Sequence, residues 1–276
     1  MDGLLITILI VIGFLVYKMI SSSRKQEGYK RWKATGSGDT ANEETAGNKW
    51  KHGAWLRHAL GVTTPKARTY PVFDEEAVVW CAGLLGVEAV RLKEILQDVS
   101  SHYREFWIRK RKGGYRMISA PDKELKSIQD TIYHRILLPV NVHPVATGFR
   151  RQHSIVDNVR PHLGKRCVLK TDIHDFFLSI RSPRVKQTFE NIGYPKNISK
   201  VLGELCCRRR HLPQGASTSP ALSNIIAYEM DRKLAAMAEE FGLTYTRYAD
   251  DLTFSGDVFP KEQVLVRVKE IIREEK

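Results

Sequence analysis

The segment Tyr245–Phe254 reads YTRYADDLTF and sets two adjacent aspartates, Asp250 and Asp251, between residues typical of β-strands. We expect a β-hairpin that carries both carboxylates at or beside its tip. Adjacent carboxylates repel each other unless a cation lies between them. At a solvated tip the repulsion would be small, and most Asp–Asp pairs are structural, so this segment alone leaves both interpretations open.

A second acidic segment favours chemistry. Val168–Asp172 is a short strand-like run that ends in an aspartate. Together with Asp250 and Asp251 it would form a cluster of three carboxylates, and Mg²⁺ prefers a few carboxylate oxygens completed by waters and substrate phosphates. Two such ions about 3.5–4 Å apart can activate an attacking hydroxyl and stabilise a leaving pyrophosphate. The cluster predicts nucleotidyl transfer with two Mg²⁺ ions, in which Asp172 and Asp250 bridge both ions and Asp251 assists.

A loop of small residues, LPQGASTSP at Leu212–Pro220, lies between the acidic segments. Glycine and serine let a backbone approach a flat ligand closely. Ser219 and Pro220 also suit the N-cap and first turn of a helix. We expect a loop that begins a helix, a role compatible with ligand binding.

A basic hairpin is expected at Tyr103–Ala120, with its turn at Gly113-Gly114. Such a dense set of cations on two strands predicts a grip on phosphates, and a charged edge that discourages aggregation is the alternative. The six basic residues are Arg104, Arg109, Lys110, Arg111, Lys112 and Arg116.

The other elements mix helices and strands without a regular βαβ rhythm, which predicts an α+β fold. A hydrophobic fraction of 42% and a charged fraction of 27% exclude wholesale disorder. Four cysteines without metal-ligand spacing fit a reducing cytoplasm. Helices are expected at Glu75–Leu85, Val87–Leu96, Leu125–Leu138, Pro183–Ile192, Ile198–Cys207 and Ser219–Phe241.

The net charge of +13 fits a polyanionic partner, either nucleic acid or an anionic membrane face, and composition alone leaves a solvated basic surface without a partner equally open. Gly3–Ile20 is apolar apart from Lys18, and as a helix it would span about 27 Å, close to the hydrocarbon core of a bilayer. Basic residues follow it, so the positive-inside rule places the rest in the cytoplasm. We expect a single-pass inner-membrane anchor at 1–20 and a flexible linker at 21–49. A cleaved signal peptide and a buried core helix are the alternatives.

Taken in order, the segments TDIHDFFLSI, LPQGASTSPALSN and YTRYADDLTFSG resemble the catalytic motifs of reverse transcriptases, with most likeness to the bacterial retron type. FWIRKRKGGYRMISAP, LKSIQDTIYHRIL and TGFRRQHSIVDNVRPH upstream resemble the same group. The resemblance implies a right-hand polymerase with fingers and an antiparallel palm sheet in residues 50–276. It also implies two Mg²⁺ ions, dNTPs, an RNA template, a DNA or RNA primer, a structured partner RNA and defence against phage.

The resemblance carries roles onto individual residues. The metal-binding aspartates of the family match Asp172, Asp250 and Asp251, and its aromatic gate against the ribose 2′-hydroxyl matches Phe177. Contacts to the incoming nucleotide and to nucleic acid match two further sets. The nucleotide set is Gln214, Gly215, Arg116 and Lys110, and the nucleic-acid set is Ser154, Asn158 and His162, in the segment that resembles the template-facing region. Arg109, Arg111 and Lys112 are expected to bind nucleic acid as part of the basic hairpin.

The chain departs from the family pattern after the last motif. It ends at Lys276, about twenty residues past Gly256, where the family continues with a lysine-bearing motif, a primer grip and a helical thumb. We therefore expect the thumb to be missing. The alternative function is a truncated, non-catalytic, membrane-tethered module that binds RNA.

Overall fold

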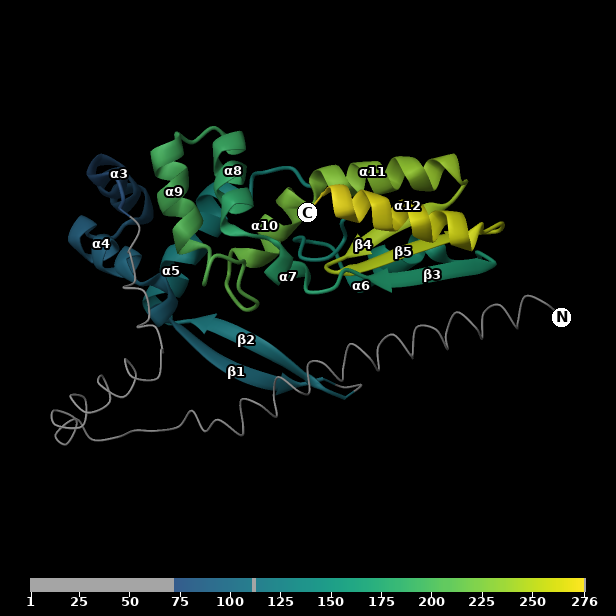
Figure 1. The fold of residues 1–276 in the computed structure, drawn as a ribbon, viewed down its shortest axis with the longest axis horizontal. Helices are drawn as coiled ribbons and strands as arrows, with labels where there is room; N and C mark the ends of the chain where they lie inside the picture. Colours follow the sequence, from purple (N-terminus) through teal and green to yellow (C-terminus); the bar gives the residue numbers. More distant parts are fainter. Residues whose placement is uncertain (1–71, 111–112, 276) are drawn as a thin grey trace, which may run out of the picture.

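The computed structural model describes residues 72–110 and 113–275 (Figure 1). The expected anchor at 1–20 and linker at 21–49 lie outside these residues, as do Arg111 and Lys112. Among the described helices, none combines the length and the apolar character needed to cross a bilayer.

Two helices open the described chain, α3 (Glu75–Leu85) and α4 (Ala89–Gln97), followed by the 3₁₀ turn η2 (Val99–His102). The side chain of Asp74 caps α3 by accepting a hydrogen bond from the Ala77 amide. Gly86 ends α3 in the left-handed conformation, with φ of 71°. Both helices lie where the sequence predicts them, to within two residues at each end.

The basic hairpin is confirmed. Strands β1 (Tyr103–Arg109) and β2 (Tyr115–Pro121) pair antiparallel from Tyr103 opposite Pro121 outward. Gly113 and Gly114 both have positive φ at the turn, which glycine adopts without steric cost. Figure 1 shows this hairpin projecting below the helices.

A helical layer joins the hairpin to the rest of the molecule. α5 (Lys123–Ile132) continues into a π-helical turn, η3 (Tyr133–Leu137), so the single expected helix ends in a different geometry. The layer also contains α8 (Ser182–Ile192), α9 (Lys196–Leu205) and α10 (Ser219–Ile226), and the short elements between them are α6 (Ile155–Val159), η4 (Arg160–His162) and α7 (Phe176–Ser179).

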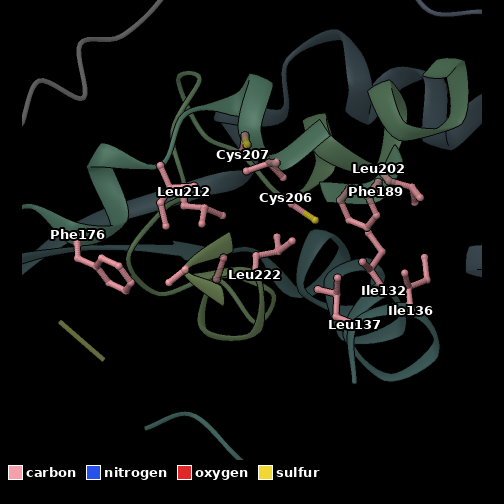
Figure 2. Packing of buried hydrophobic residues seen from close by; sticks show 14 of the residues in the cluster. Ile132, Ile136, Leu137, Phe176, Phe189, Leu202, Cys206, Cys207, Leu212 and Leu222 are labelled. Carbon is pink, nitrogen blue, oxygen red and sulfur yellow. The ribbon is translucent and has the colours of Figure 1, made fainter. Parts of the chain in front are cut away.

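The hydrophobic core runs through this layer (Figure 2). Side chains from α5 and η3 meet Phe189 of α8, Leu202 of α9 and Leu222 of α10, with Cys206 between them. Burial raises the pKa of the Cys206 thiol to about 12, so this cysteine stays protonated and packs as a small apolar group.

The second sheet has three antiparallel strands in the order β3-β5-β4, namely β3 (Cys167–Asp172), β5 (Asp251–Gly256) and β4 (Thr244–Tyr248). Both strand segments that the sequence predicts here are confirmed. On one face, Leu252, Phe254 and Tyr245 are buried. Figure 1 shows helices α11 (Tyr228–Glu240) and α12 (Lys261–Glu274) on one side of this sheet. The mixed α and β architecture with antiparallel sheets is therefore as expected.

The expectation of one long helix at Ser219–Phe241 is wrong, because α10 and α11 are separate helices that meet at Ala227. Ala227 has φ of −80° and ψ of 1°, outside the helical range. The break contains neither proline nor glycine, so no helix-breaking residue marks it in the sequence.

Candidate active site

The three aspartates of the predicted cluster meet at one end of the β3-β5-β4 sheet. Asp172, the last residue of β3, lies directly opposite Asp251, the first residue of β5. The amide of Ile173 donates a hydrogen bond of 2.8 Å to the carbonyl oxygen of Asp250. Opposed residues of an antiparallel pair point to the same face of the sheet. The register therefore brings Asp172 and Asp251 together, with Asp250 beside them in the turn.

The electrostatics of this end of the sheet show how close the charges are. Burial, together with the negative charges of Asp251 and Asp172, raises the pKa of Asp250. The positive charge of Arg116 on β2 acts in the opposite direction. The guanidinium of Arg116 is thus within electrostatic reach of Asp250.

The donor set fits a divalent cation in two respects. Oδ1 of Asp172 is buried and has no hydrogen-bond partner among the described residues. Such an orphaned oxygen, beside a carboxylate with raised pKa, is expected where a cation belongs. In the arrangement seen here, however, Oδ2 of Asp251 lies 3.0 Å from Nζ of Lys170. Within residues 72–110 and 113–275 no three His, Cys, Asp or Glu side chains are already arranged to hold a metal.

The aspartates depend on a strained turn between β4 and β5. Ala249 has φ of 59°, a left-handed conformation that alanine adopts at a cost of about 1–2 kcal/mol. In a two-residue hairpin loop this first position normally favours glycine. Nη1 of Arg247 donates to the carbonyl oxygen of Ala249 at 3.0 Å and to Oδ1 of Asn224 at 3.0 Å. The turn is thus held from inside the protein.

Arg247 is itself fixed by a buried ion pair. Arg247 and Asp231 of α11 are both 0% exposed, and Nη2 of the arginine lies 2.6 Å from Oδ2 of the aspartate. Nε donates to Oδ1 of Asp231 at 2.8 Å, and the hydroxyl of Tyr245 donates to the same oxygen at 3.0 Å. Burial alone would lower the pKa of Arg247, but the hydrogen bonds and charge of Asp231 raise it. The guanidinium of Arg247 therefore remains charged inside the core.

A neighbouring loop closes against the same turn. A Cβ at Gly148 would lie 2.7 Å from the amide nitrogen of Ala249, so only glycine fits there. The carbonyl oxygen of Gly148 accepts a hydrogen bond of 2.8 Å from Nδ2 of Asn224. The sequence analysis did not identify Gly148, Asn224, Asp231 or Arg247. The available signal was position, because Gly148, Asn224 and Arg247 all lie within the quoted motifs.

The small-residue loop packs on the basic hairpin. The amide of Ser119 on β2 donates 2.8 Å to the carbonyl oxygen of Gln214. A Cβ at Gly215, where φ is 126°, would lie 2.8 Å from Cγ2 of Ile118 and 2.9 Å from the carbonyl oxygen of Ser119. The loop therefore lies against the strand that carries Arg116.

Two adjacent aromatic residues follow the strand of Asp172. Phe176 is buried, and the guanidinium carbon of Arg247 lies 5.7 Å from its ring centroid. Phe177 is half-buried, and its ring centroid lies 6.0 Å from that of Phe149. Phe176 is a core residue, and Phe177 is the more accessible of the two.

The predicted nucleic-acid contacts occupy different environments. Arg109 is exposed at the end of β1, and Lys110 follows it at the edge of the turn, where its amide donates to the carbonyl oxygen of Gly114. Ser154 caps α6, accepting from the Val156 amide at 3.2 Å. Contacts of Arg109, Lys110 and Ser154 with a nucleotide or nucleic acid stay a prediction.

Asn158 and His162 are buried rather than directed to solvent. Oδ1 of Asn158 accepts from the hydroxyl of Thr147 at 2.9 Å. The ring nitrogens of His162 lie 2.6 Å from Oγ of Ser255 and 2.7 Å from Oγ1 of Thr246, so the histidine bridges β5 and β4. Burial lowers its pKa and favours the neutral ring. A direct contact of either side chain with nucleic acid stays a prediction.

Comparison with known proteins agrees with this geometry. Residues 108–275 match the family model described as reverse transcriptase (RNA-dependent DNA polymerase). The chain belongs to the reverse transcriptase family, and the resemblance drawn from its motifs is confirmed.

Its relatives are retron reverse transcriptases. The Ec86 enzyme of Escherichia coli is 37% identical over 64% of this chain and 55% of its own length. The Mx65 enzyme of Myxococcus xanthus is 38% identical over 63% of this chain and 45% of its own. The Mx162 enzyme of the same species is 32% identical over 84% and 52% respectively. The chain thus spans about half the length of these curated relatives.

Proposed function

We propose that the protein is an RNA-directed DNA polymerase of the retron type that copies an RNA template into DNA from a DNA or RNA primer and dNTPs. In this proposal the basic hairpin and its helices act as fingers, and the β3-β5-β4 sheet acts as the palm. The observation that carries it is the register that sets Asp172 opposite Asp251, with Asp250 in the adjoining turn.

Asp172, Asp250 and Asp251 would hold the divalent cations, and two Mg²⁺ ions suit three carboxylates. When bound, Mg²⁺ would activate the primer hydroxyl and stabilise the leaving pyrophosphate. The unpartnered Oδ1 of Asp172 supports this assignment. For Asp251 to take part, its carboxylate must leave Lys170.

The remaining residues position the substrates. Arg116 is within electrostatic reach of Asp250 and can bind the triphosphate in bidentate fashion. The backbone of Gln214 and Gly215 forms a surface against β2 on which the incoming nucleotide can lie. Phe177 follows the strand of Asp172 and its ring lies near that of Phe149; in this proposal it packs under the sugar and leaves no room for a 2′-hydroxyl.

Primer extension on an RNA template with Mg²⁺ and dNTPs tests the proposal. The double variant Asp250→Asn, Asp251→Asn should lose at least about 10²–10³-fold in rate, because charge stabilisation at the reacting phosphate is removed. Asp257→Asn is the matched control, since Asp257 is exposed beyond the end of β5. Activity that survives the double substitution would refute the assignment.

A second candidate is a non-catalytic, membrane-tethered module that binds RNA. The Lys170–Asp251 ion pair favours it, because one carboxylate of the cluster already has a cation as partner. This candidate predicts salt-sensitive RNA binding without nucleotide incorporation. Titration with Mn²⁺, followed by electron paramagnetic resonance, discriminates the two: a polymerase site should bind the ion, and Asp172→Asn should weaken that binding.

We also propose that residues 1–20 anchor the protein in the inner membrane, that 21–49 form a flexible linker, and that residues 50–276 work in the cytoplasm. Carbonate washing of membranes tests the anchor, since release into the supernatant would refute a spanning helix. A structured partner RNA and a role in phage defence complete the proposal. Sequencing of co-purified RNA and phage plating on cells with and without Asp250→Asn test these two points.

A further inference from the structure

A tight turn of basic residues, Arg208–Arg209–Arg210–His211, precedes the small-residue loop. The amide of Arg208 donates to the carbonyl oxygen of His211 at 2.9 Å, and the amide of His211 donates back at 3.0 Å. The two central residues have φ of 47° and 68°. This is the pattern of a two-residue hairpin turn of type I′.

Arginine is an unfavourable choice for both central positions. A type I′ turn needs positive φ twice, so Asn-Gly or Gly-Gly is preferred there. Strained backbone persists where the surrounding structure imposes it, and it gathers at functional sites. Here two contacts hold the turn to its surroundings. The Ser182 amide donates to the carbonyl oxygen of Arg210 at 2.9 Å, and Nδ1 of His211 lies 2.6 Å from the carbonyl oxygen of Leu178.

The four side chains divide into an inner and an outer pair. Arg208 points inward, where its guanidinium pairs with Glu105 of β1 and its Nη1 lies 3.4 Å from Oγ of Ser119. Arg209 and Arg210 are exposed. Among the described residues Arg209 has one acidic neighbour, Glu105, at 3.9 Å, and that carboxylate already pairs with Arg208.

A third exposed cation lies next to this pair. Arg181, at the start of α8, forms an isolated β-bridge with His211. Across residues 72–110 and 113–275, neither Arg181 nor Arg210 takes part in an ion pair. Within the part of the chain that the structure describes, the charges of Arg210 and Arg181 are therefore not neutralised by a carboxylate.

The turn sits beside the proposed nucleotide surface rather than on the carboxylate end of the sheet. Leu212 directly follows it and donates from its amide to the carbonyl oxygen of Ile180, and Gln214 comes two residues later. Figure 1 shows the connection from α9 to α10 between the helical layer and the β1–β2 hairpin. A strand that approaches Gln214 from outside would pass these cations.

We propose that Arg209, Arg210 and Arg181 bind the phosphodiester backbone of the single-stranded RNA template before it enters the active site. This rests on the proposed polymerase function. Guanidinium groups suit phosphate oxygens, and contacts of this kind position a strand without reading its sequence. The pair of strained arginines places two such groups at the tip of one rigid turn.

The test measures binding, without dNTPs, of fluorescent RNA template annealed to a primer. Two templates are compared, one with a 5′ overhang of a single nucleotide and one with about eight, within the usual site size of single-strand grooves. The variant Arg209→Asn, Arg210→Gly removes both charges and installs the preferred turn residues. The variant Arg209→Lys, Arg210→Lys keeps the charges. Lys269→Ala, Arg273→Ala on exposed positions of α12 is the charge-matched control.

For the long overhang, the Asn-Gly variant should bind about tenfold more weakly, and its slope of log K against log salt should fall by about 1.4 for two lost single-strand contacts. Its melting temperature should stay equal or rise, because the turn strain is relieved. The lysine variant and the α12 control should stay within a few-fold of wild type, and all variants should bind the short overhang as wild type does.

Three results would overturn the proposal. Equal loss on both templates would place the contact on the duplex, and no loss on either would leave the turn to an acidic protein partner. A loss matched by the α12 control would show only a net-charge effect. Primer extension on the short-overhang template is read in parallel. If that is active while the overhang effect is missing, this inference fails and the polymerase function stands.

Discussion

Replacing the buried ion pair by apolar side chains, Arg247→Met with Asp231→Leu, should separate the positioning of the active-site turn from the stability of the fold. Both side chains are 0% exposed, so neither charge gains from water. Exchange of a buried pair for apolar residues of similar volume is often neutral or stabilises by about 1–4 kcal/mol. The substitution therefore need not unfold the protein.

The cost comes from the groups that the pair serves. Three partners lose a hydrogen bond: the Tyr245 hydroxyl, Oδ1 of Asn224 and the carbonyl oxygen of Ala249. Each unsatisfied buried group costs about 1–3 kcal/mol, so the three together cost about 3–9 kcal/mol. The apolar exchange offsets about 1–4 kcal/mol of this, which leaves a net loss of about 3–4 kcal/mol at the middle of both ranges. Asp231→Leu alone leaves a buried, unpaired guanidinium and should cost about 3–5 kcal/mol. The double variant should be the more stable of the two.

Activity should respond differently. Without Arg247, the carbonyl oxygen of Ala249 loses the hydrogen bond that this guanidinium donates, although Ala249 keeps its left-handed backbone conformation only with support. The adjoining Asp250 and Asp251 then lose their fixed position. A displacement of about 1 Å at reacting groups can cost about 10²-fold in rate.

The assay pairs denaturant unfolding with single-turnover primer extension, and the loss should appear in kcat rather than in KM for dNTP. The exposed pair of Arg232 and Glu229 on the same helix is the control, and its replacement should change stability by less than about 1 kcal/mol. A folded double variant with wild-type kcat would refute the reasoning.

Three further predictions concern single positions. Gly148→Ala places a Cβ 2.7 Å from the Ala249 amide nitrogen, so the turn must shift. Thermal melts should show a loss of stability of about 1–3 kcal/mol, and primer extension should slow. The control is Gly83→Ala in a helix with open space around it, which should stabilise by about 0.5–1 kcal/mol in the same melts. Burial and neighbouring carboxylates raise the pKa of Asp250, so its ionised form destabilises the metal-free fold as pH rises through that pKa. Asp250→Asn should therefore raise the melting temperature in EDTA at neutral pH, lose that gain in acid, and abolish extension; a lower melting temperature would contradict this. Burial lowers the pKa of His162 in the folded protein below the ordinary histidine pKa of about 6.5. The free energy of unfolding should therefore fall as pH drops from about 6.5 toward the pKa of the folded state. Calorimetry should find a smaller fall for His162→Gln.

Much of the site could be predicted because its signals are local. Alternating apolar residues mark β3 and the β4–β5 hairpin, and the aspartates terminate or join those strands. Gly113-Gly114 marks the turn of the basic hairpin in the same way. The resemblance of ordered motifs then supplied the pairing between distant segments, which spacing alone cannot.

The parts that could not be predicted depend on contacts between distant segments. Arg247 reads as one more basic residue beside the aspartates, and only the fold shows it enclosed by Asp231 and Asn224 from two helices. The separation of those helices at Ala227 has no proline or glycine to announce it. Helix α12 lies beyond the last recognised motif, and no helix was predicted there.

The two sides of the site are built with opposite tolerance for change. On the sheet, a buried ion pair and a close glycine hold a strained turn, so the aspartates are presented rigidly although they repel each other. On the β1–β2 hairpin, the exposed arginines remain hydrated, so no desolvation penalty opposes them and they can adjust to a moving polyanion. Chemistry at a phosphate needs charges fixed in advance, whereas a nucleic acid that advances after every addition needs contacts that form and break quickly. Substitutions in the network around Arg247 should therefore act on the rate of chemistry, and those on the basic surfaces should act on affinity and its dependence on salt.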